Sequence, residues 1–357
     1  MTFAHGGDVE RVAREAGIPV DRLLDFSANI NPMGLPPRAA ERLAHEAADP
    51  RSWSRYPDAQ APELRSALCQ YLAVAPESIV LGAGADSLIH AAVRGLAPQR
   101  CLIPEPAFCE YRRAAEAFGC QSVAIPQQLP QAGDLLVLNN PHNPTGACAP
   151  RAEMLARIAA ARALHAAVLV DEAFIDYAPE SAITGDASLA EGVVAIRSLT
   201  KFFGCPGLRV GYAVAAPETA RRLAAQLPPW PITTLAANAL AEALQDAPYR
   251  AEALRSNQLA RAALAAALAA LHCRVFPSAA NFLLLSLPTG FHALQIRDRL
   301  IREHSILVRE CNSFDGLEPG RYLRVAVRRP EENVRLVDAL SALFREIPCP
   351  THSLTQP

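Results

Sequence analysis

The chain has almost no lysine. Of its 34 lysine and arginine residues, only Lys201 is a lysine. Arginine stays protonated at any working pH, whereas a lysine in a desolvating environment loses its proton and becomes a nucleophilic amine. The lone lysine therefore indicates chemistry that arginine cannot perform, unless it is a surface residue that has persisted by chance in an arginine-rich chain.

Other absences exclude several classes of protein. The formal net charge is only −2 over 357 residues, so no net field favours binding to nucleic acid or to an anionic membrane. No apolar run approaches the roughly 20 residues of a membrane span, and the N-terminus lacks the basic and apolar regions of a signal peptide. We therefore expect a soluble, cytoplasmic protein whose partner is a small molecule, with neither nucleic acid nor membrane among its partners.

The nine cysteines and nine histidines carry no metal signature. The cysteines form no C-x-x-C pair and are odd in number, which favours reduced thiols over disulfides or a zinc site. The histidines show no H-E-x-x-H spacing. We expect no metal site.

Short apolar runs alternate with helical patterns through the first part of the chain. Strands are expected at 78–81, 101–103, 122–125, 135–138, 167–170, 193–196 and 210–214. Helices between several of them are expected at 86–97, 109–119 and 150–165. This alternation predicts an α/β fold with a mostly parallel central sheet, whose ligands bind at the carboxyl ends of the strands.

The pattern changes after residue 217 and predicts a smaller α+β domain. Long helices are expected at 236–246 and 249–271, and a further helix near 291–303. Strands are expected at 281–285, 306–308 and 322–327. The predicted organisation is an N-terminal arm (1–30) associated with the small domain and the active site, a large domain (31–216), a connecting helical region (217–246) and a small C-terminal domain (247–357).

A glycine-containing turn, Gly82-Ala-Gly-Ala-Asp86, follows an expected strand and opens an expected helix. Backbone N–H groups and the helix dipole at such a turn can hold a phosphate, and Gly84, Ala85 and Asp86 are the candidate residues. The turn lacks the G-K-[ST] ending of a nucleotide-binding P-loop. Taken alone, an ordinary connection between a strand and a helix is the more frequent explanation.

Two further strand ends carry polar residues. The string Asn139-Asn-Pro-His-Asn-Pro-Thr-Gly146 contains two Asn/Pro turns, which make a rigid loop that presents Asn143. Asp171 ends an apolar run, where a partly buried carboxylate needs a cationic partner, and a protonated pyridine nitrogen would supply one. The alternatives are a plain proline-rich turn and an aspartate that caps the following turn.

The only lysine lies in Ser198-Leu-Thr-Lys-Phe-Phe-Gly-Cys-Pro-Gly-Leu-Arg209, between a strand and an apolar segment. Desolvation there favours the neutral, nucleophilic amine. Ser198, Thr200 and Arg209 would add donors to a dianionic phosphate, with Arg209 suited to bidentate contact. Arg324 alternates with apolar neighbours in an expected strand, so it faces a cleft and requires an anion unless the strand is exposed.

These strings resemble the class I/II aminotransferases of the fold-type I superfamily, and the resemblance runs through nearly the whole chain. It rests on Asn143-Pro-Thr-Gly146, Asp171-Glu-Ala, Ser198-Leu-Thr-Lys201 and Gly207-Leu-Arg209. It implies pyridoxal 5′-phosphate (PLP) as the cofactor and a homodimer as the assembly.

The resemblance also implies roles for single residues. Lys201 is expected to attach PLP covalently, and Asp171 to pair with its ring nitrogen. Asn143 is expected to bond the ring hydroxyl, Phe108 to stack on the ring and Arg324 to bind the substrate carboxylate. The residues expected around the cofactor phosphate are Gly84, Ala85, Asp86, Ser198, Thr200, Arg209 and, from a second subunit, Tyr56.

One position departs from the pattern of the family. Many relatives carry a tyrosine three residues after the aspartate, where it touches the ring hydroxyl, but this chain has Phe174. Asn143 must then hold the ring hydroxyl with less help. The departure bears on aminotransferase activity and leaves cofactor binding intact.

Two N-terminal strings, His5-Gly-Gly-Asp8 and Asp25-Phe-Ser-Ala-Asn-Ile-Asn-Pro-Met-Gly34, resemble the threonine-phosphate decarboxylases of cobalamin biosynthesis. The resemblance implies conversion of L-threonine O-3-phosphate to (R)-1-amino-2-propanol O-2-phosphate and CO₂. The residues expected at the substrate are His5, Gly6, Gly7, Asn31 and Arg324, the last at either the carboxylate or the phosphate.

Two alternatives stay open. Histidinol-phosphate aminotransferases fit the same large-domain motifs almost as well, and the His5-Gly-Gly string and Phe174 stand against them. A PLP-binding protein without turnover would need an attached DNA-binding or partner module, and we see neither a helix-turn-helix segment nor a basic tail.

Overall fold

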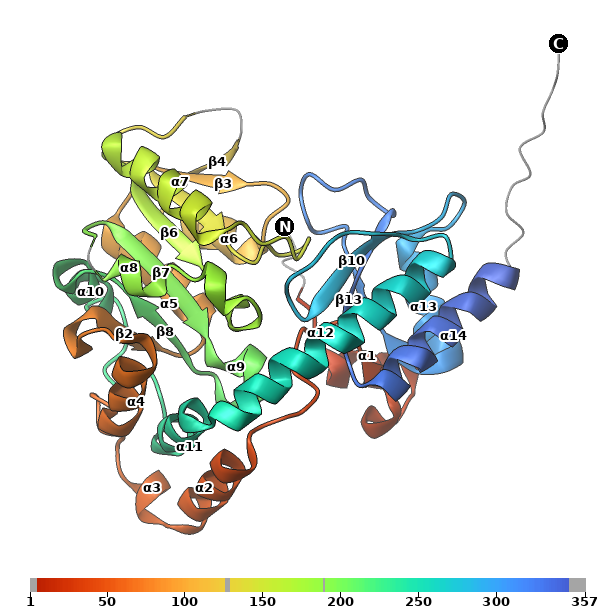
Figure 1. Cartoon of the computed structure of the whole chain (residues 1–357), viewed down its shortest axis with the longest axis horizontal. Helices are drawn as coiled ribbons and strands as arrows, with labels where there is room; N and C mark the ends of the chain where they lie inside the picture. Colours follow the sequence, from red (N-terminus) through yellow and green to blue (C-terminus); the bar gives the residue numbers. More distant parts are fainter. Residues whose placement is uncertain (1–4, 126–128, 189, 347–357) are drawn as a thin grey trace. The chain divides into compact units, whose positions relative to one another are not determined.

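The computed structural model describes residues 5–125, 129–188 and 190–346, and the chain divides into two compact units (Figure 1). The small unit consists of Met1–Asn29, Pro144–Gly146 and Arg255–Pro357. The large unit consists of Ile30–Asn143 and Ala147–Leu254. The N-terminal segment therefore belongs with the C-terminal third of the chain, and the boundary between the units falls inside the long helix α12 (Ala247–Ala270).

A seven-stranded sheet forms the centre of the large unit. Its strands are β2 (Ile79–Gly82), β3 (Arg100–Pro104), β4 (Gln121–Ile125), β5 (Leu135–Asn139), β6 (Ala167–Asp171), β7 (Val193–Ser198) and β8 (Gly211–Val214). They lie in the order β2-β8-β7-β6-β5-β3-β4. All neighbours from β7 to β4 are parallel, whereas β8 is antiparallel to both β2 and β7. The predicted mostly parallel sheet is confirmed, with β8 as the exception.

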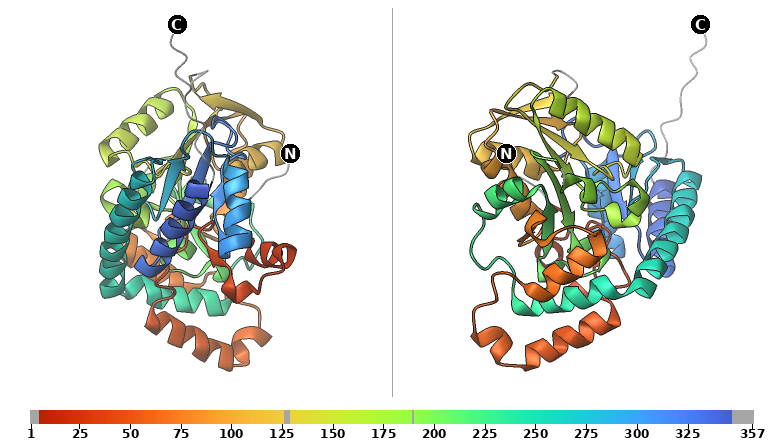
Figure 2. Two further views of the ribbon diagram at one scale, coloured as in Figure 1. Left: turned by 90° about the vertical axis from the view of Figure 1, so that its right-hand side faces the viewer. Right: turned by 60° about the vertical axis from the view of Figure 1, so that its left-hand side comes forward.

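Helices cover both faces of this sheet, as Figure 2 shows. One face packs against α5 (Ala85–Leu96), α6 (Cys109–Ala117) and α10 (Pro217–Ala224), and the other against α7 (Arg151–Ala163) and α8 (Thr184–Ala187). Along β5, Val137 points to the first face and Leu138 to the second. Both side chains are buried, which explains why the strands read as continuous apolar runs. Each buried aliphatic side chain contributes roughly 1.5–3 kcal/mol to stability.

The remaining helices of the large unit form a second apolar layer. They are α2 (Pro37–Ala48), α3 (Arg51–Ser54), α4 (Pro62–Leu72), the short α9 (Leu199–Phe202) and α11 (Thr234–Gln245). Leu64 and Leu68 of α4 share a buried cluster with Leu240 and Leu244 of α11. Thr233 caps α11, because its hydroxyl accepts from the backbone N–H of Ala236 at 3.2 Å.

The small unit contains a four-stranded antiparallel sheet and a two-stranded parallel sheet. The first has the order β12 (Arg309–Glu310), β13 (Tyr322–Ala326), β10 (Phe282–Ser286), β9 (Arg274–Val275), and the second pairs β1 (Leu24–Asp25) with β11 (Ile306–Leu307). The helices are α1 (Val9–Ala16), the C-terminal part of α12, α13 (Ala293–His304) and α14 (Pro330–Glu346). Leu323 and Val325 of β13 point into the core of this unit, so Arg324 between them points to the opposite face of the sheet.

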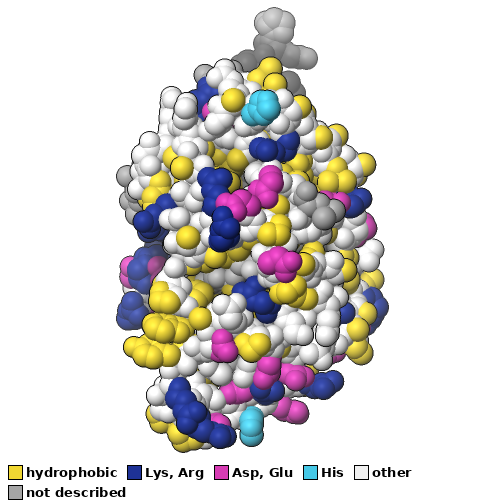
Figure 3. Space-filling model, turned by 90° about the vertical axis from the view of Figure 1, so that its left-hand side faces the viewer, with side chains coloured by type: hydrophobic (Ala, Val, Ile, Leu, Met, Phe, Trp, Pro, Cys, Tyr) yellow, Lys and Arg dark blue, Asp and Glu magenta, His cyan; other side chains and the backbone are white. Residues whose placement is uncertain are grey.

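The surface carries no field of a single sign on the face that Figure 3 displays, where arginine and acidic side chains are interspersed. Among the described residues, no helix is both long enough and apolar enough to span a bilayer. The eight cysteines in the described part of the chain are all free.

Candidate active site

Three neighbouring parallel strands bring polar residues to one edge of the large sheet. Asn139 ends β5, Asp171 ends β6 and Ser198 ends β7. Asn139 lies directly opposite Asp171 in the register of β5 and β6. The carboxyl edge of a parallel sheet is where such folds bind their ligands. The sheet thus collects residues that are far apart in the sequence.

Asp171 is a buried carboxylate held by two donors. The hydroxyl of Tyr111 donates to its Oδ2 at 2.5 Å, and the backbone N–H of Ala173 donates to its Oδ1 at 2.9 Å. Burial raises the pKa of Asp171 above its ordinary value, and the two hydrogen bonds and the charge of Lys201 offset only part of that rise. An ionised carboxylate in this place is costly until a cation reaches it.

Asn143 is positioned by the residue that ends β5. The side chain of Asn139 accepts from the backbone N–H of Asn143 at 2.7 Å and donates to the carbonyl oxygen of Asp171 at 2.9 Å. The backbone N–H of Asn140 donates to the same carbonyl at 2.9 Å. The loop that carries Asn143 is therefore tied to the strand end that carries Asp171.

Lys201 lies in α9, directly after β7. The hydroxyls of Ser198 and Thr200, both buried, hydrogen-bond each other at 2.8 Å. The backbone N–H of Asn31 donates to the carbonyl of Lys201 at 3.0 Å, and its side chain donates to the carbonyl of Phe202 at 2.8 Å. The side chain of Asn31, which the sequence placed at the substrate, therefore braces the lysine segment.

The Gly84 turn and Arg209 form a corner at the start of α5. Gly84 has a φ of +88° at the start of α5, and a Cβ there would lie 2.5 Å from Nη2 of Arg209. A Cβ on Gly211 of β8 would lie 2.8 Å from the backbone nitrogen of Ala85. Glycine at both positions keeps the first turn of α5 and the guanidinium close. Exposed N–H groups of a helix start and a guanidinium suit a phosphate dianion.

The side chain of Asp86 contacts Arg209 in this corner. Arg209 donates to its Oδ1 at 2.8 Å. A carboxylate would repel a phosphate, so the side chain of Asp86 orients the guanidinium while its backbone N–H belongs to the helix start.

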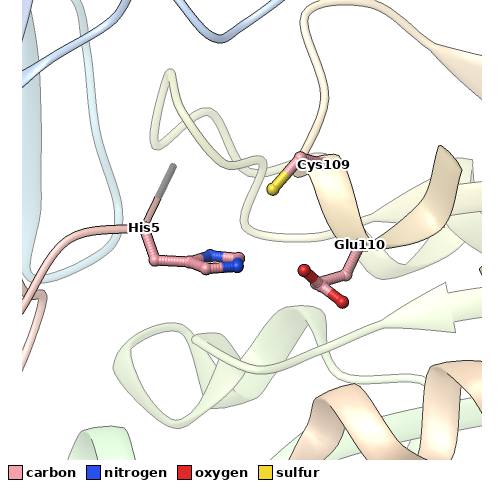
Figure 4. A group of neighbouring side chains, drawn as sticks. All are labelled: His5, Cys109 and Glu110. Carbon is pink, nitrogen blue, oxygen red and sulfur yellow. The ribbon is translucent and has the colours of Figure 1, made fainter. Parts of the chain in front are cut away.

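Helix α6 starts beside Phe108. Figure 4 shows Cys109 and Glu110 in its first turn, and Glu110 is buried. The ring of Tyr111 meets the ring of Phe108 edge-on, with centroids 5.8 Å apart. Phe108 and the donor to Asp171 are therefore held by the same helical turn.

Tyr56 lies on the surface of the large unit. Its ring is 77% exposed and stacks on Trp230, with centroids 4.3 Å apart. Trp53 of α3 is 64% exposed. Three aromatic side chains, Trp53, Tyr56 and Trp230, are thus presented to solvent by this unit.

Two buried arginines lie opposite each other in the small unit. Arg309 of β12 pairs with Arg324 of β13. Burial, together with the nearby charge of Arg309, lowers the pKa of Arg324 to about 10. The guanidinium of Arg324 lies over the rings of Phe282 and Phe314, at 5.4 and 6.0 Å from their centroids. An anion would stabilise these two like charges.

The N-terminal glycine pair meets Arg324 at Ser27. A Cβ on Gly6 would clash with the carbonyl oxygen of Ser27, and the N–H of Gly7 donates to the Ser27 hydroxyl at 2.8 Å. Arg324 donates to the Ser27 carbonyl at 3.0 Å. The structure therefore brings together three of the residues predicted at the substrate, with His5 exposed just before them.

Sequence reasoning gave no role to three residues of these sites. Tyr111 lies in the first turn of α6, three residues after Phe108, which precedes the helix. Ser27 lies inside the N-terminal string that carried the resemblance. Arg309 has no distinguishing signal, because it is one of many arginines and its importance comes from a strand partner in the fold.

The family of class I and II aminotransferases matches residues 21–340. The chain belongs to this family. It is 36% identical over 354 residues to the threonine-phosphate decarboxylase of Salmonella typhimurium, a match that covers 94% of this chain and 95% of the relative. It is also 34% identical to a histidinol-phosphate aminotransferase of Roseiflexus castenholzii, over 93% of this chain and 92% of the relative.

A solved relative has a similar fold. The L-threonine-O-3-phosphate decarboxylase of Porphyromonas gingivalis matches with a TM-score of 0.82 and 25% identity, over 90% of this chain and 100% of that structure. The predicted fold class, a fold-type I PLP-dependent transferase, is confirmed.

PLP is the cofactor of this aminotransferase-family enzyme, as the sequence predicted. The residues of the large unit fit it. The buried carboxylate of Asp171, whose pKa burial raises, suits a cationic ring nitrogen. The corner at Gly84, which a side chain would fill, suits the phosphate.

Proposed function

We propose that this enzyme decarboxylates L-threonine O-3-phosphate to (R)-1-amino-2-propanol O-2-phosphate and CO₂, as a step of cobalamin biosynthesis. The observation that carries the proposal is the meeting of Gly6, Gly7 and Arg324 at Ser27, because it joins the N-terminal string to a buried guanidinium. The 36% identity to the Salmonella enzyme supports the same reaction.

The large unit holds the cofactor in this proposal. PLP, when bound, withdraws electrons from the α-carbon of an amino acid attached to it. Lys201 attaches the cofactor, and Asp171 keeps the ring nitrogen protonated. Asn143 hydrogen-bonds the ring hydroxyl, and Phe108 covers one face of the ring. The cofactor phosphate binds at the Gly84–Asp86 turn with Ser198, Thr200 and Arg209.

The small unit holds the substrate. L-Threonine O-3-phosphate has two anionic groups, a carboxylate and a phosphate, and this unit has two buried guanidinium groups, on Arg309 and Arg324. With PLP bound in the large unit, guanidinium groups that hold both anionic ends would fix the orientation of the α-carbon substituents, and this orientation would favour loss of CO₂ over loss of a proton. Asn31 braces the lysine segment through its hydrogen bonds and stays among the residues proposed at the substrate.

Histidinol-phosphate aminotransferase is the alternative activity, and the 34% identity to the enzyme of Roseiflexus castenholzii supports it. Phe174, which is buried and has no hydroxyl, favours the decarboxylase. The test is to incubate PLP-loaded enzyme with L-threonine O-3-phosphate and, separately, with histidinol phosphate and 2-oxoglutarate. Stoichiometric CO₂ with an aminopropanol phosphate is the expected result. Glutamate formation without CO₂ would contradict the proposal.

The enzyme acts as a homodimer in this proposal, with Tyr56 of one subunit at the cofactor phosphate of the other. The exposed aromatic side chains Trp53, Tyr56 and Trp230 support such an interface, since aromatic residues are enriched there. Replacing Trp230 by aspartate is expected to give monomers of weakened PLP affinity in analytical ultracentrifugation and cofactor titration. Monomers of the unaltered protein would contradict it. The cytoplasmic location stays a prediction.

A further inference from the structure

Tyr111 contacts both groups that face the cofactor ring in the proposed site. Its hydroxyl donates to Oδ2 of Asp171 at 2.5 Å, and its ring packs edge-on against Phe108 at 5.8 Å. Tyr111 is 2% exposed, so this hydrogen bond is shielded from bulk solvent. One side chain therefore fixes the carboxylate at the edge of the ring and the aromatic group at its face.

The hydrogen bond to Tyr111 has an electrostatic consequence for Asp171. A carboxylate offers about four acceptor sites, and the two protein donors, Tyr111 and the N–H of Ala173, occupy one on each oxygen. A charge-assisted donor on each oxygen favours the ionised carboxylate against the effect of burial and fixes its direction, while acceptor sites are left for a ring nitrogen. Without the phenolic donor, the proton shared with that nitrogen would move toward the carboxylate.

We propose that Tyr111 is a positioning residue that favours the ionised form of Asp171 and directs its carboxylate at the cofactor nitrogen. The inference rests on the proposed role of Asp171 and goes beyond it, because Tyr111 itself touches neither substrate nor cofactor. Its hydroxyl sets how strongly the enzyme distinguishes a ring nitrogen from a carbon atom in the same place.

The test compares the affinity of the apoenzyme for PLP and for the analogue in which carbon replaces the ring nitrogen. Both ligands share the phosphate, the aldehyde and the ring hydroxyl, so the ratio of their dissociation constants isolates the contact at the nitrogen. Tyr111→Phe is expected to reduce the preference for PLP by about tenfold, the effect of one hydrogen bond to a charged group. Because the ratio is measured on one folded variant, a general loss of stability cancels.

Tyr212→Phe is the matched control. Tyr212 is also a fully buried tyrosine of the large unit, and its hydroxyl has no hydrogen-bond partner among the described residues. The ratio of the two dissociation constants measured for Tyr212→Phe is expected to equal that of the unaltered enzyme. Equal losses in both variants would overturn the inference, because they would show general loosening of the site.

Asp171→Asn separates the two claims. If Asp171→Asn abolishes the preference for PLP and Tyr111→Phe leaves it intact, the inference about Tyr111 fails and the role of Asp171 stands. If Asp171→Asn also leaves the preference intact, both fail.

A second measurement reports directly on the ring nitrogen. With ¹⁵N-labelled PLP, the nitrogen resonance of the Tyr111→Phe enzyme is expected to move from the protonated toward the neutral position, and that of Tyr212→Phe to stay. Should phenylalanine at position 111 prevent folding, 3-fluorotyrosine placed at position 111 alone keeps the hydroxyl and makes it a stronger donor, so the resonance is expected to move toward the protonated position. An unmoved resonance in the altered enzyme would overturn the inference.

Discussion

Buried charged side chains are arranged differently in the two units of the enzyme. In the large unit, Arg197 and Asp176 form a buried ion pair, and Glu172 accepts a hydrogen bond from the N–H of Ile183 at 2.6 Å. In the small unit, Arg309 and Arg324 lie opposite each other across two strands. Arg197 and Asp176 are opposite charges that neutralise each other within the large unit. Arg309 and Arg324 are like charges, and an anionic ligand between them would reduce their repulsion.

Asp171 is a residue of the large unit whose buried charge also carries an electrostatic cost. It is buried, and burial raises its pKa. In the proposed function, the negative charge of Asp171 serves a cationic ring nitrogen, and the positive charges of the small unit serve the anionic groups of a substrate. The comparison suggests a rule that the variants below test: the sign of a buried charge matches the ligand group that its unit is proposed to bind.

The largest effect is expected for Lys201→Ala. Loss of the only lysine removes covalent attachment of the cofactor, and decarboxylation should fall by about 10⁴-fold. Borohydride reduction followed by mass spectrometry should find the cofactor mass on the peptide containing Lys201 in the unaltered enzyme and on no peptide of the variant. A labelled peptide in the variant would show that another group attaches PLP.

Asp171→Asn tests the negative charge of the large unit and is expected to weaken PLP binding about a hundredfold, the effect of a lost charge-assisted pair. The same substitution is expected to stabilise the apoprotein.

Because burial raises the pKa of Asp171 above its ordinary 3.8, the folded state favours the protonated acid. Its stability contribution is complete below pH 3.8 and is lost as the pH rises through the folded-state pKa.

The apoprotein of Asp171→Asn should therefore be more stable than the unaltered apoprotein at neutral pH, and the difference should shrink as the pH falls. Urea denaturation of both apoproteins at several pH values measures this. A variant that is less stable at neutral pH would show that Asp171 carries no electrostatic cost.

Arg324→Gln tests the positive charge of the small unit. The KM for L-threonine O-3-phosphate should rise about thirtyfold, because a hydrogen bond to a charged group is lost, and PLP affinity should not change. The matched control is Arg299→Gln, whose guanidinium pairs with Glu303 at 2.7 Å on the same unit. An equal rise of KM in both variants would contradict a specific role for Arg324.

The smallest effect concerns the ring hydroxyl. Asn143→Ala should weaken PLP binding about tenfold, and adding Phe174→Tyr should recover about fivefold, because the new phenol supplies one neutral hydrogen bond. Cofactor titration of the single and double variants measures both. A double variant that binds PLP no more tightly than Asn143→Ala alone would show that position 174 does not reach the ring hydroxyl.

The sequence was a good guide wherever local pattern decides the structure. The apolar runs at 135–138 and 167–170 became β5 and β6, because strands covered on both faces must be apolar throughout. Asp171 was foreseen at a strand end for the same reason. The antiparallel direction of β8 was not foreseen, since the same short run of apolar residues serves a strand of either direction.

Non-local pairing limits what the sequence can predict. The boundary between the units lies within the continuous helix α12, where helical periodicity does not change. Arg309 became informative only when its strand placed it opposite Arg324. Asn31 was expected at the substrate from its place in a string, whereas its hydrogen bonds to the lysine segment depend on a fold that joins residues far apart.

The central claim is that fixing two anionic ends of the substrate directs the enzyme to loss of CO₂. The most direct test follows L-threonine O-3-phosphate labelled at the carboxyl carbon through one reaction with PLP-loaded enzyme. The account predicts that the label leaves as CO₂ in equal amount to unlabelled aminopropanol phosphate. Label retained in a non-volatile keto acid would contradict it and would make the enzyme an aminotransferase.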